Sequence, residues 1–163
     1  SYPVGRFGAG GVFKPDYESV NEKITEEQVI FNMINSFLGR MHLASYVNLL
    51  SARKFGLIQE GVKVHDELTE FKKRAYPFLP QGFCKFGDEL VASGLARGDK
   101  IFLAVWNMGD AGHKYVDTGV KIASLKTVYP KENQLEIREN NGVIDICFTQ
   151  KYQARFFEII KMQ

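Results

Sequence analysis

The stretch Lys100-Ile-Phe-Leu-Ala-Val-Trp-Asn107 decides the fold of this chain. It is apolar at odd and at even positions, so a strand formed from it would have two apolar faces. A strand of this kind is typical of the interior of a protein, where it lies between two layers that each cover one face. We therefore expect residues 100–107 to form a central strand.

Short strand signals surround this stretch on the C-terminal side. Residues 135–139 and 143–149 flank Asn140-Asn141-Gly142, and Asn-Gly readily takes the positive φ angles of a tight hairpin turn. Further strands are expected at residues 88–95, 116–122, 126–129 and 152–160, separated by Gly, Asp and Asn at short intervals. Six or more short strands with such turns predict an antiparallel β-sandwich.

The N-terminal half has a helical period instead. Thr25-Glu26-Glu27-Gln28 is a capping box, so a helix should begin there and end near Gly39. Residues 40–44 then alternate like a short strand, and Ser51 can cap a second helix that Pro77 and Pro80 stop. The buried faces of the two helices are expected to carry Val29, Met33 and Phe37, and Leu57, Gly61, Val64, Leu68, Phe71 and Ala75.

Composition excludes several classes of function. Lysine and arginine number 21 against 19 aspartates and glutamates, and they form no basic stripe, so we expect no nucleic-acid partner. No apolar run approaches the roughly 20 residues that span a bilayer, so we expect no membrane partner. Cys84 and Cys147 are far apart without CxxC spacing, which favours reduced thiols and a cytoplasmic location. The start on Ser1, followed by a glycine-rich stretch, suggests a piece excised from a longer protein.

Several segments resemble the C-terminal part of the α-galactosidases of glycoside hydrolase family 36. They are Gly5-Arg-Phe-Gly-Ala-Gly10, Tyr17-Glu-Ser-Val-Asn-Glu-Lys23, Asp88-Glu-Leu-Val-Ala-Ser-Gly-Leu95 and Tyr152-Gln-Ala-Arg-Phe-Phe-Glu158. The resemblance implies an α+β fragment in which residues 1–80 are the last β/α repeats of a (β/α)8 barrel. Residues 81–163 would be the C-terminal antiparallel β-sandwich domain.

The resemblance also implies that this chain holds no catalytic residue. Enzymes of this family use two aspartates in motifs that this sequence lacks, and a retaining glycosidase needs two carboxyls about 5 Å apart. The rim loop at Phe7 and Gly8 is the one candidate for substrate binding, although the family's usual histidine is missing after it. Carboxylates near the first helix start are expected to be structural, because negative charge favours that end of a helix; these are Asp16, Glu18, Glu22, Glu26 and Glu27.

Several other residues resemble functional motifs, but their surroundings in the sequence favour structural roles. His42, His65 and His113 have no i, i+4 partner, so neither a metal site nor a cofactor is expected. Arg97-Gly98-Asp99 is typical of a turn between strands, and the glycines at 8–11 lack the lysine and hydroxyl spacing of a phosphate loop. Trp106 is interpreted as a core residue rather than a sugar platform. Ser19, Ser45 and Ser51 lack the setting of a serine hydrolase nucleophile.

Two functions remain open at this point. In the first, the chain is the non-catalytic end of an α-galactosidase-like enzyme, inactive alone, whose partners are the remainder of the parent enzyme and the parent's α-galactoside oligosaccharide. In the second, it is an independent β-sandwich that binds carbohydrate or another partner. Self-association through Met33, Phe37, Leu68 and Phe71 is expected unless the helices fold back onto the sandwich. We also expect residues after about 80 to fold on their own.

Overall fold

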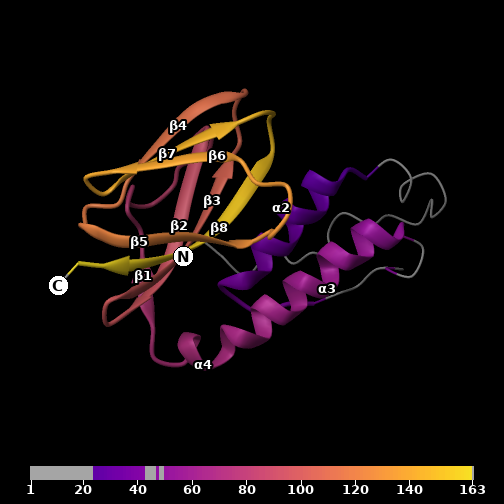
Figure 1. Ribbon diagram of the computed structural model, residues 1–163, viewed down its shortest axis with the longest axis horizontal. Coiled ribbons are helices and arrows are strands. Elements are labelled where there is room, and N and C mark those ends of the chain that lie inside the picture. Colours follow the sequence, from indigo (N-terminus) through magenta and orange to yellow (C-terminus); the bar gives the residue numbers. More distant parts are fainter. Residues whose placement is uncertain (1–23, 43–46, 48–49, 163) are drawn as a thin grey trace.

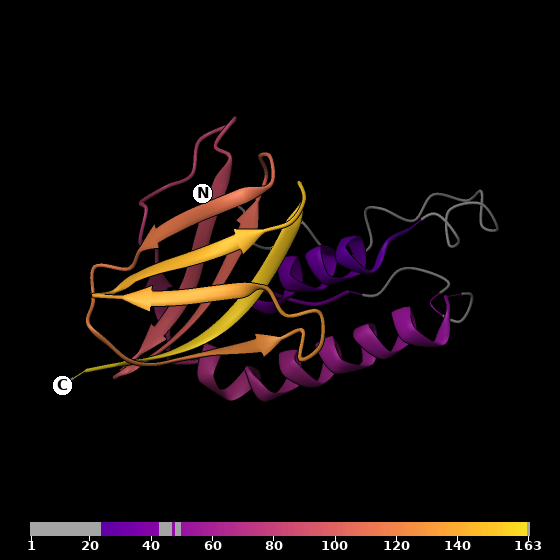
Figure 2. The same ribbon diagram turned by 45° about the horizontal axis from the view of Figure 1, so that its top comes forward.

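The computed structural model describes residues 24–42, 47 and 50–162, which form three stacked layers (Figures 1 and 2). A three-stranded sheet packs on one face of a five-stranded sheet, and two helices lie on the other face of the larger sheet. All strand pairs are antiparallel. The described chain is therefore a small α+β protein made mostly of antiparallel sheet.

The larger sheet, sheet A, has the strand order β1-β2-β3-β8-β5. Its strands are β1 (Tyr76–Phe78), β2 (Leu90–Arg97), β3 (Lys100–Asn107), β5 (Ile122–Tyr129) and β8 (Gln153–Lys161). β3 is the third of five strands, so the expected central strand is confirmed in place and in bounds.

Sheet B has the order β4-β7-β6, with β4 (Gly112–Asp117), β6 (Glu136–Asn140) and β7 (Val143–Phe148). The predicted hairpin between β6 and β7 is confirmed, since Asn141 and Gly142 have φ angles of 49° and 84°. The core between the two sheets contains Val116, Ile144, Ile146 and Phe148 of sheet B.

Strand β3 divides its side chains between two cores. Ile101, Leu103 and Val105 point to sheet B, whereas Ala104 and Trp106 belong to the core beneath the helices. This alternation is the reason why the sequence of the strand is apolar at every interior position.

The helical layer consists of α2 (Glu26–Phe37) and α3 (Ala52–Glu67), with the short α4 (Thr69–Lys72) after it. The capping box of α2 is present, because the Thr25 hydroxyl accepts from the Gln28 amide at 3.2 Å and the Gln28 side chain accepts from the Thr25 amide at 2.8 Å. Ser51 caps α3 as predicted. Helix α2 ends at Phe37, two residues before Gly39.

The apolar faces of these helices pack on sheet A. Phe37 lies 5.0 Å from Phe156 and 5.1 Å from Tyr129 between ring centroids, and the Tyr129 hydroxyl donates to the Leu57 carbonyl at 3.1 Å. Met33, Phe37 and Leu68 are 1%, 0% and 3% exposed. The helices fold back onto the sandwich, and sheet A therefore covers these apolar side chains, from which we expected self-association, within one chain. Phe71, the fourth residue of that expected interface, is half-buried, with its ring centroid 4.9 Å from that of Phe102. Self-association itself stays a prediction.

A buried ion pair fastens the helical layer to the sandwich. Arg155 of β8 is fully buried and donates two hydrogen bonds of 2.8 Å to the two carboxylate oxygens of Glu27. The same guanidinium donates to the Asn133 and Ala154 carbonyls at 2.7 Å. Because two parallel bonds fix both distance and orientation, this pair sets the position of the first turn of α2 over β8.

Two of the predicted strands differ from the structure. Arg40, Met41 and His42 form no strand, and residues 43–46 lie outside the described part. The strand expected at 116–122 is wrong, because β4 ends at Asp117 and β5 begins at Ile122. The Thr118 hydroxyl donates to the Val120 and Gly142 carbonyls there, which favours a turn over a continuing strand.

Strand β1 was not predicted, because Pro77 was interpreted as a residue that ends the preceding helix. It pairs only with β2 at the edge of sheet A, where a proline that lacks an amide donor is tolerated. β1 thus joins the sandwich from the N-terminal side of residue 80. The division of the chain into residues 1–80 and 81–163, and the folding of the second part on its own, stay predictions.

Candidate functional site

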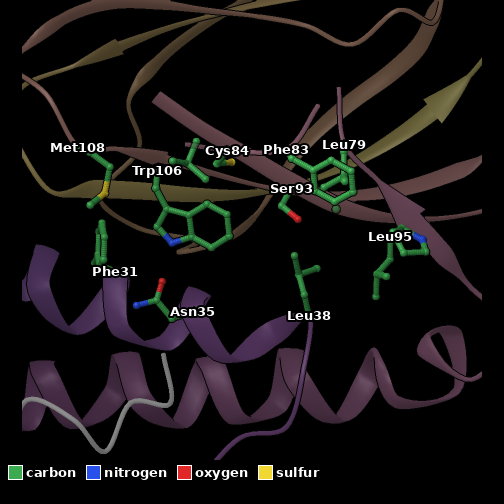
Figure 3. A pocket seen from close by; sticks show the side chains of 13 residues that line it. Phe31, Asn35, Leu38, Leu79, Phe83, Cys84, Ser93, Leu95, Trp106 and Met108 are labelled. Atoms are coloured by element: carbon green, nitrogen blue, oxygen red, sulfur yellow. The ribbon is translucent and has the colours of Figure 1, made fainter. Parts of the chain in front are cut away.

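A pocket of about 460 Å³ lies between α2 and sheet A. It occurs where the helical layer does not cover the β1–β2 edge of the sheet (Figure 3). Phe31 and Asn35 of α2 and Leu38, the C-cap residue of this helix, form one wall, at the i, i+4, i+7 spacing of a single helix face. Its volume lies within the range of about 300–1,000 Å³ that is typical of small-molecule sites.

Strand β2 supplies the floor of this pocket. Val91, Ser93 and Leu95 alternate along the strand and therefore point to the same face of sheet A. Leu79, Phe83 and Cys84 line the pocket on the side away from α2, and Trp106 and Met108 close one end (Figure 3). Pro77 also belongs to the lining.

Trp106 carries the one buried donor of the pocket that lacks a partner. Its side chain is confirmed as a core side chain, at 7% exposure, yet its indole nitrogen Nε1 makes no hydrogen bond to any described residue. Figure 3 shows this nitrogen directed towards Asn35 of α2, and no hydrogen bond joins the two side chains. A buried donor without an acceptor costs about 1–3 kcal/mol, so the fold tolerates a defect at this point.

The lining carries no formal charge. Among the pocket residues only Cys84 has an ionisable side chain, and burial raises the pKa of its thiol. A thiol with a raised pKa is a weak nucleophile at neutral pH. The site is suited to bind a neutral ligand, and its lining holds no carboxylate that could act as acid, base or nucleophile.

The segment 76–86, which supplies Pro77, Leu79, Phe83 and Cys84 to the pocket lining, also carries exposed aromatic side chains. Tyr76, Phe83 and Phe86 are all well exposed, with Phe86 entirely so. Three large exposed aromatic rings within so short a segment are typical of a surface that contacts another molecule or another part of a protein.

Of the residues singled out in the sequence, Trp106 and Cys84 line this pocket. Phe7 and Gly8, the candidate rim loop, lie outside the described residues, as do Asp16, Glu18, Glu22, Ser19 and Ser45. Glu26 and Glu27 occupy the first turn of α2 as expected, where Glu26 pairs with Arg53 at 2.6 Å and Glu27 with Arg155. Asn133 and Arg53 donate hydrogen bonds that lower the pKa of Glu26 below its ordinary value.

The three histidines are separate from one another. His42 is exposed, and His65 contacts the Lys72 amine at 2.9 Å beside the C-terminal end of α2. His113 pairs with Asp145 at 2.9 Å on the outer face of sheet B. Within residues 24–42, 47 and 50–162, no group of three or more His, Cys, Asp or Glu side chains could hold a metal ion.

The remaining motifs have structural positions. Arg97-Gly98-Asp99 forms the turn between β2 and β3, with Gly98 at a φ of 62°, as predicted. Cys84 and Cys147 are free thiols. No helix of the described part is long and apolar enough to cross a membrane.

The comparisons with known proteins give a likeness of fold. No protein family that was searched matches the chain, and no curated protein matches it. The structure is similar to part of an α-amylase from Anoxybacillus that represents a new glycosyl hydrolase subclass, with a TM-score of 0.50 and 11% identity. The similarity covers 81% of this chain and 28% of that one, so the chain spans less than a third of that enzyme's length.

An α-L-fucosidase, isoenzyme 2 from Paenibacillus thiaminolyticus, also matches, with a TM-score of 0.30 and 9% identity over 68% of this chain and 20% of that one. The α-amylase match is the one that supports a shared fold. The fold of the described chain is therefore of a kind found as a portion of a larger glycoside hydrolase.

The pocket itself was missed by sequence reasoning. The alternation of Val91, Ser93 and Leu95 was visible as a strand, but nothing in it indicated that the helices would leave these side chains uncovered. That coverage depends on where α2 crosses the sheet, which only the three-dimensional packing determines.

Proposed function

We propose that the chain is the C-terminal, non-catalytic part of an α-galactosidase-like retaining glycoside hydrolase, where it completes and braces the catalytic barrel. The observation that carries this proposal is the helical layer, α2 and α3, fastened to the sandwich by the Arg155–Glu27 pair. A fixed pair of helices on one face of a sandwich can transmit the rigidity of the sheets to whatever packs on those helices.

Three further facts support the proposal. The fold is like less than a third of a longer α-amylase. The candidate pocket has no carboxylate in its lining, whereas glycosidic cleavage requires two. The exposed aromatic rings at 76–86 offer a contact surface for the rest of a larger protein.

Reconstitution of the parent in two pieces tests this function. The gene segment upstream of Ser1 would be expressed with and without this chain, and release of p-nitrophenol from its α-galactoside would be measured. We expect no turnover by either piece alone and activity when both are present. An upstream segment that encodes no barrel, or that is fully active and equally stable without this chain, would refute the proposal.

One observation favours the alternative of an independent carbohydrate-binding module. Tyr115 is 59% exposed on the outer face of sheet B, beside His113, Asp145 and Arg138. An exposed ring flanked by hydrogen-bonding side chains suits the apolar face and the hydroxyls of a sugar. Saturable binding of an oligosaccharide by the isolated chain, abolished by Tyr115→Ala and retained by Tyr76→Ala, would favour this module over the brace.

A further inference from the structure

The pocket beneath α2 has the features of a ligand site, and they are independent of the function proposed above. It is bounded on three sides by regular structure: a helix face, a strand floor and the end of β3. Phe31, Leu38, Val91 and Leu95 give it apolar walls. A pocket built on strands and helices keeps its shape without a ligand, which reduces the ordering cost of binding.

One buried hydrogen-bond donor of the pocket has no acceptor among the described residues. The Trp106 indole N–H is buried, donates to no described residue, and is directed towards the Asn35 carboxamide. Ser93, at 7% exposure, adds a hydroxyl on the floor. An acceptor atom placed between Trp106 and Asn35 would complete the hydrogen bonding of a donor that the protein alone leaves unsatisfied.

The lining also limits the chemistry of the occupant. It holds no formal charge at neutral pH, so a carboxylate or an ammonium would lose its hydration without gaining a counter-ion. A sugar would bury several hydroxyls against only three polar side chains, Asn35, Ser93 and Trp106, besides the weakly polar Cys84. A neutral and mainly apolar molecule with a single acceptor fits this lining.

We propose that the pocket binds a neutral aromatic small molecule whose carbonyl oxygen accepts a hydrogen bond from the Trp106 indole N–H. The aromatic rings of the ligand lie against Phe31, Leu38 and Val91. The volume of about 460 Å³ accommodates a bicyclic ring system.

A matched pair of ligands tests the proposal, and the protein contains its own reporter. Trp106 is the sole tryptophan, so a ¹H–¹⁵N spectrum has one indole N–H signal, which reports on this pocket. The two probes are 2-acetylnaphthalene and 2-ethylnaphthalene, which have similar size and differ in the carbonyl. We expect saturable one-to-one binding of the ketone, with a downfield shift of the indole proton, and about tenfold weaker binding of the hydrocarbon without that shift.

A pair of variants locates the binding. Val91→Phe puts a ring into the pocket, and Leu125→Phe makes the same kind of change at another half-buried position of sheet A outside the pocket. We expect Val91→Phe to weaken binding of the ketone at least tenfold and Leu125→Phe to leave it unchanged, with the backbone spectrum confirming that each variant is folded. If Val91→Phe does not fold, Asn35→Leu is the substitute variant. We expect Asn35→Leu to reduce the preference of the protein for the ketone over the hydrocarbon.

Three results would overturn the proposal. The first is the absence of saturable shifts with either probe up to its solubility limit. The second is equal binding of both probes with an unmoved indole signal, which would indicate an apolar cavity without a recognition donor. The third is equal loss of binding in Val91→Phe and Leu125→Phe.

Discussion

Removal of one partner from the Arg155–Glu27 pair is the sharpest test of how the helices are held on the sandwich. Arg155 is completely buried, while the Glu27 side chain is 16% exposed. Glu27→Leu leaves a guanidinium in the core without its carboxylate, which should cost about 3–5 kcal/mol of unfolding free energy. Arg155→Met leaves a carboxylate that can still reach water, and the Asn133 and Ala154 carbonyls lose a donor, so we expect a smaller cost of about 1–3 kcal/mol.

The double variant decides between a buried pair and two independent contacts. Glu27→Leu with Arg155→Met replaces both charges by apolar side chains, and it should be more stable than Glu27→Leu alone by about 1–4 kcal/mol. The measurement is urea unfolding at pH 7, followed by Trp106 fluorescence and by circular dichroism. The exposed pair Glu136–Arg138 is the control, and Glu136→Gln should cost less than about 1 kcal/mol. Single costs that add to the double cost within about 0.5 kcal/mol would refute the reasoning.

Three other perturbations follow from single contacts. The lowered pKa of Glu26 gives stability that is present above the ordinary glutamate pKa of about 4.3 and is lost as pH falls through the lowered pKa. Glu26→Gln should therefore be less stable than the wild type near neutral pH and approach it in urea unfolding between about pH 5 and pH 3. Gly94→Ala places a Cβ 2.3 Å from the Phe102 carbonyl oxygen and should lower unfolding free energy by about 1–3 kcal/mol. Gly56→Ala, with no atom within 4 Å, should be neutral or stabilising by up to about 1 kcal/mol, and the reverse order would contradict the crowding argument. Tyr129→Phe removes the buried bond to the Leu57 carbonyl and should cost about 1 kcal/mol, measured by thermal unfolding; no change would mean that the bond contributes nothing.

The parts of the fold that the sequence predicts are those set by local signals. Strand β3 follows from an apolar pattern on both faces, the β6–β7 hairpin from Asn141 and Gly142, and α2 from its capping box. Each of these depends on residues within one element, so a short window of sequence is sufficient. The prediction failed at Thr118, where a side chain two residues after the start of the expected strand at 116–122 donates a hydrogen bond to the Gly142 carbonyl, in a turn that is distant in sequence.

The candidate site lies beyond such reasoning because its properties arise between elements. The sequence identifies Trp106 as a core residue. Whether its indole nitrogen finds an acceptor depends on the side chains of other elements, such as Asn35 of α2, and a sequence pattern does not place these. Arg155 shows the same limitation, because its carboxylate partner lies 128 residues earlier in the chain. The sequence left two outcomes open for the apolar helix faces, which could be covered by a second molecule or by the sandwich. Periodicity identifies an apolar face without identifying what covers it.

The position of β8 has a consequence for biosynthesis. It is the last strand in chain order, yet it lies between β3 and β5 in sheet A. While residues 108–152 are being translated, at about 5–20 residues per second, β3 has on that side an open edge with unpaired backbone groups for several seconds. A nascent chain in this state can pair with other nascent chains, so the requirement for a chaperone should be greatest just before β8 leaves the ribosome. Slowing of translation by rare codons between β3 and β8 should then increase aggregation, whereas the same codons placed before β3 should not.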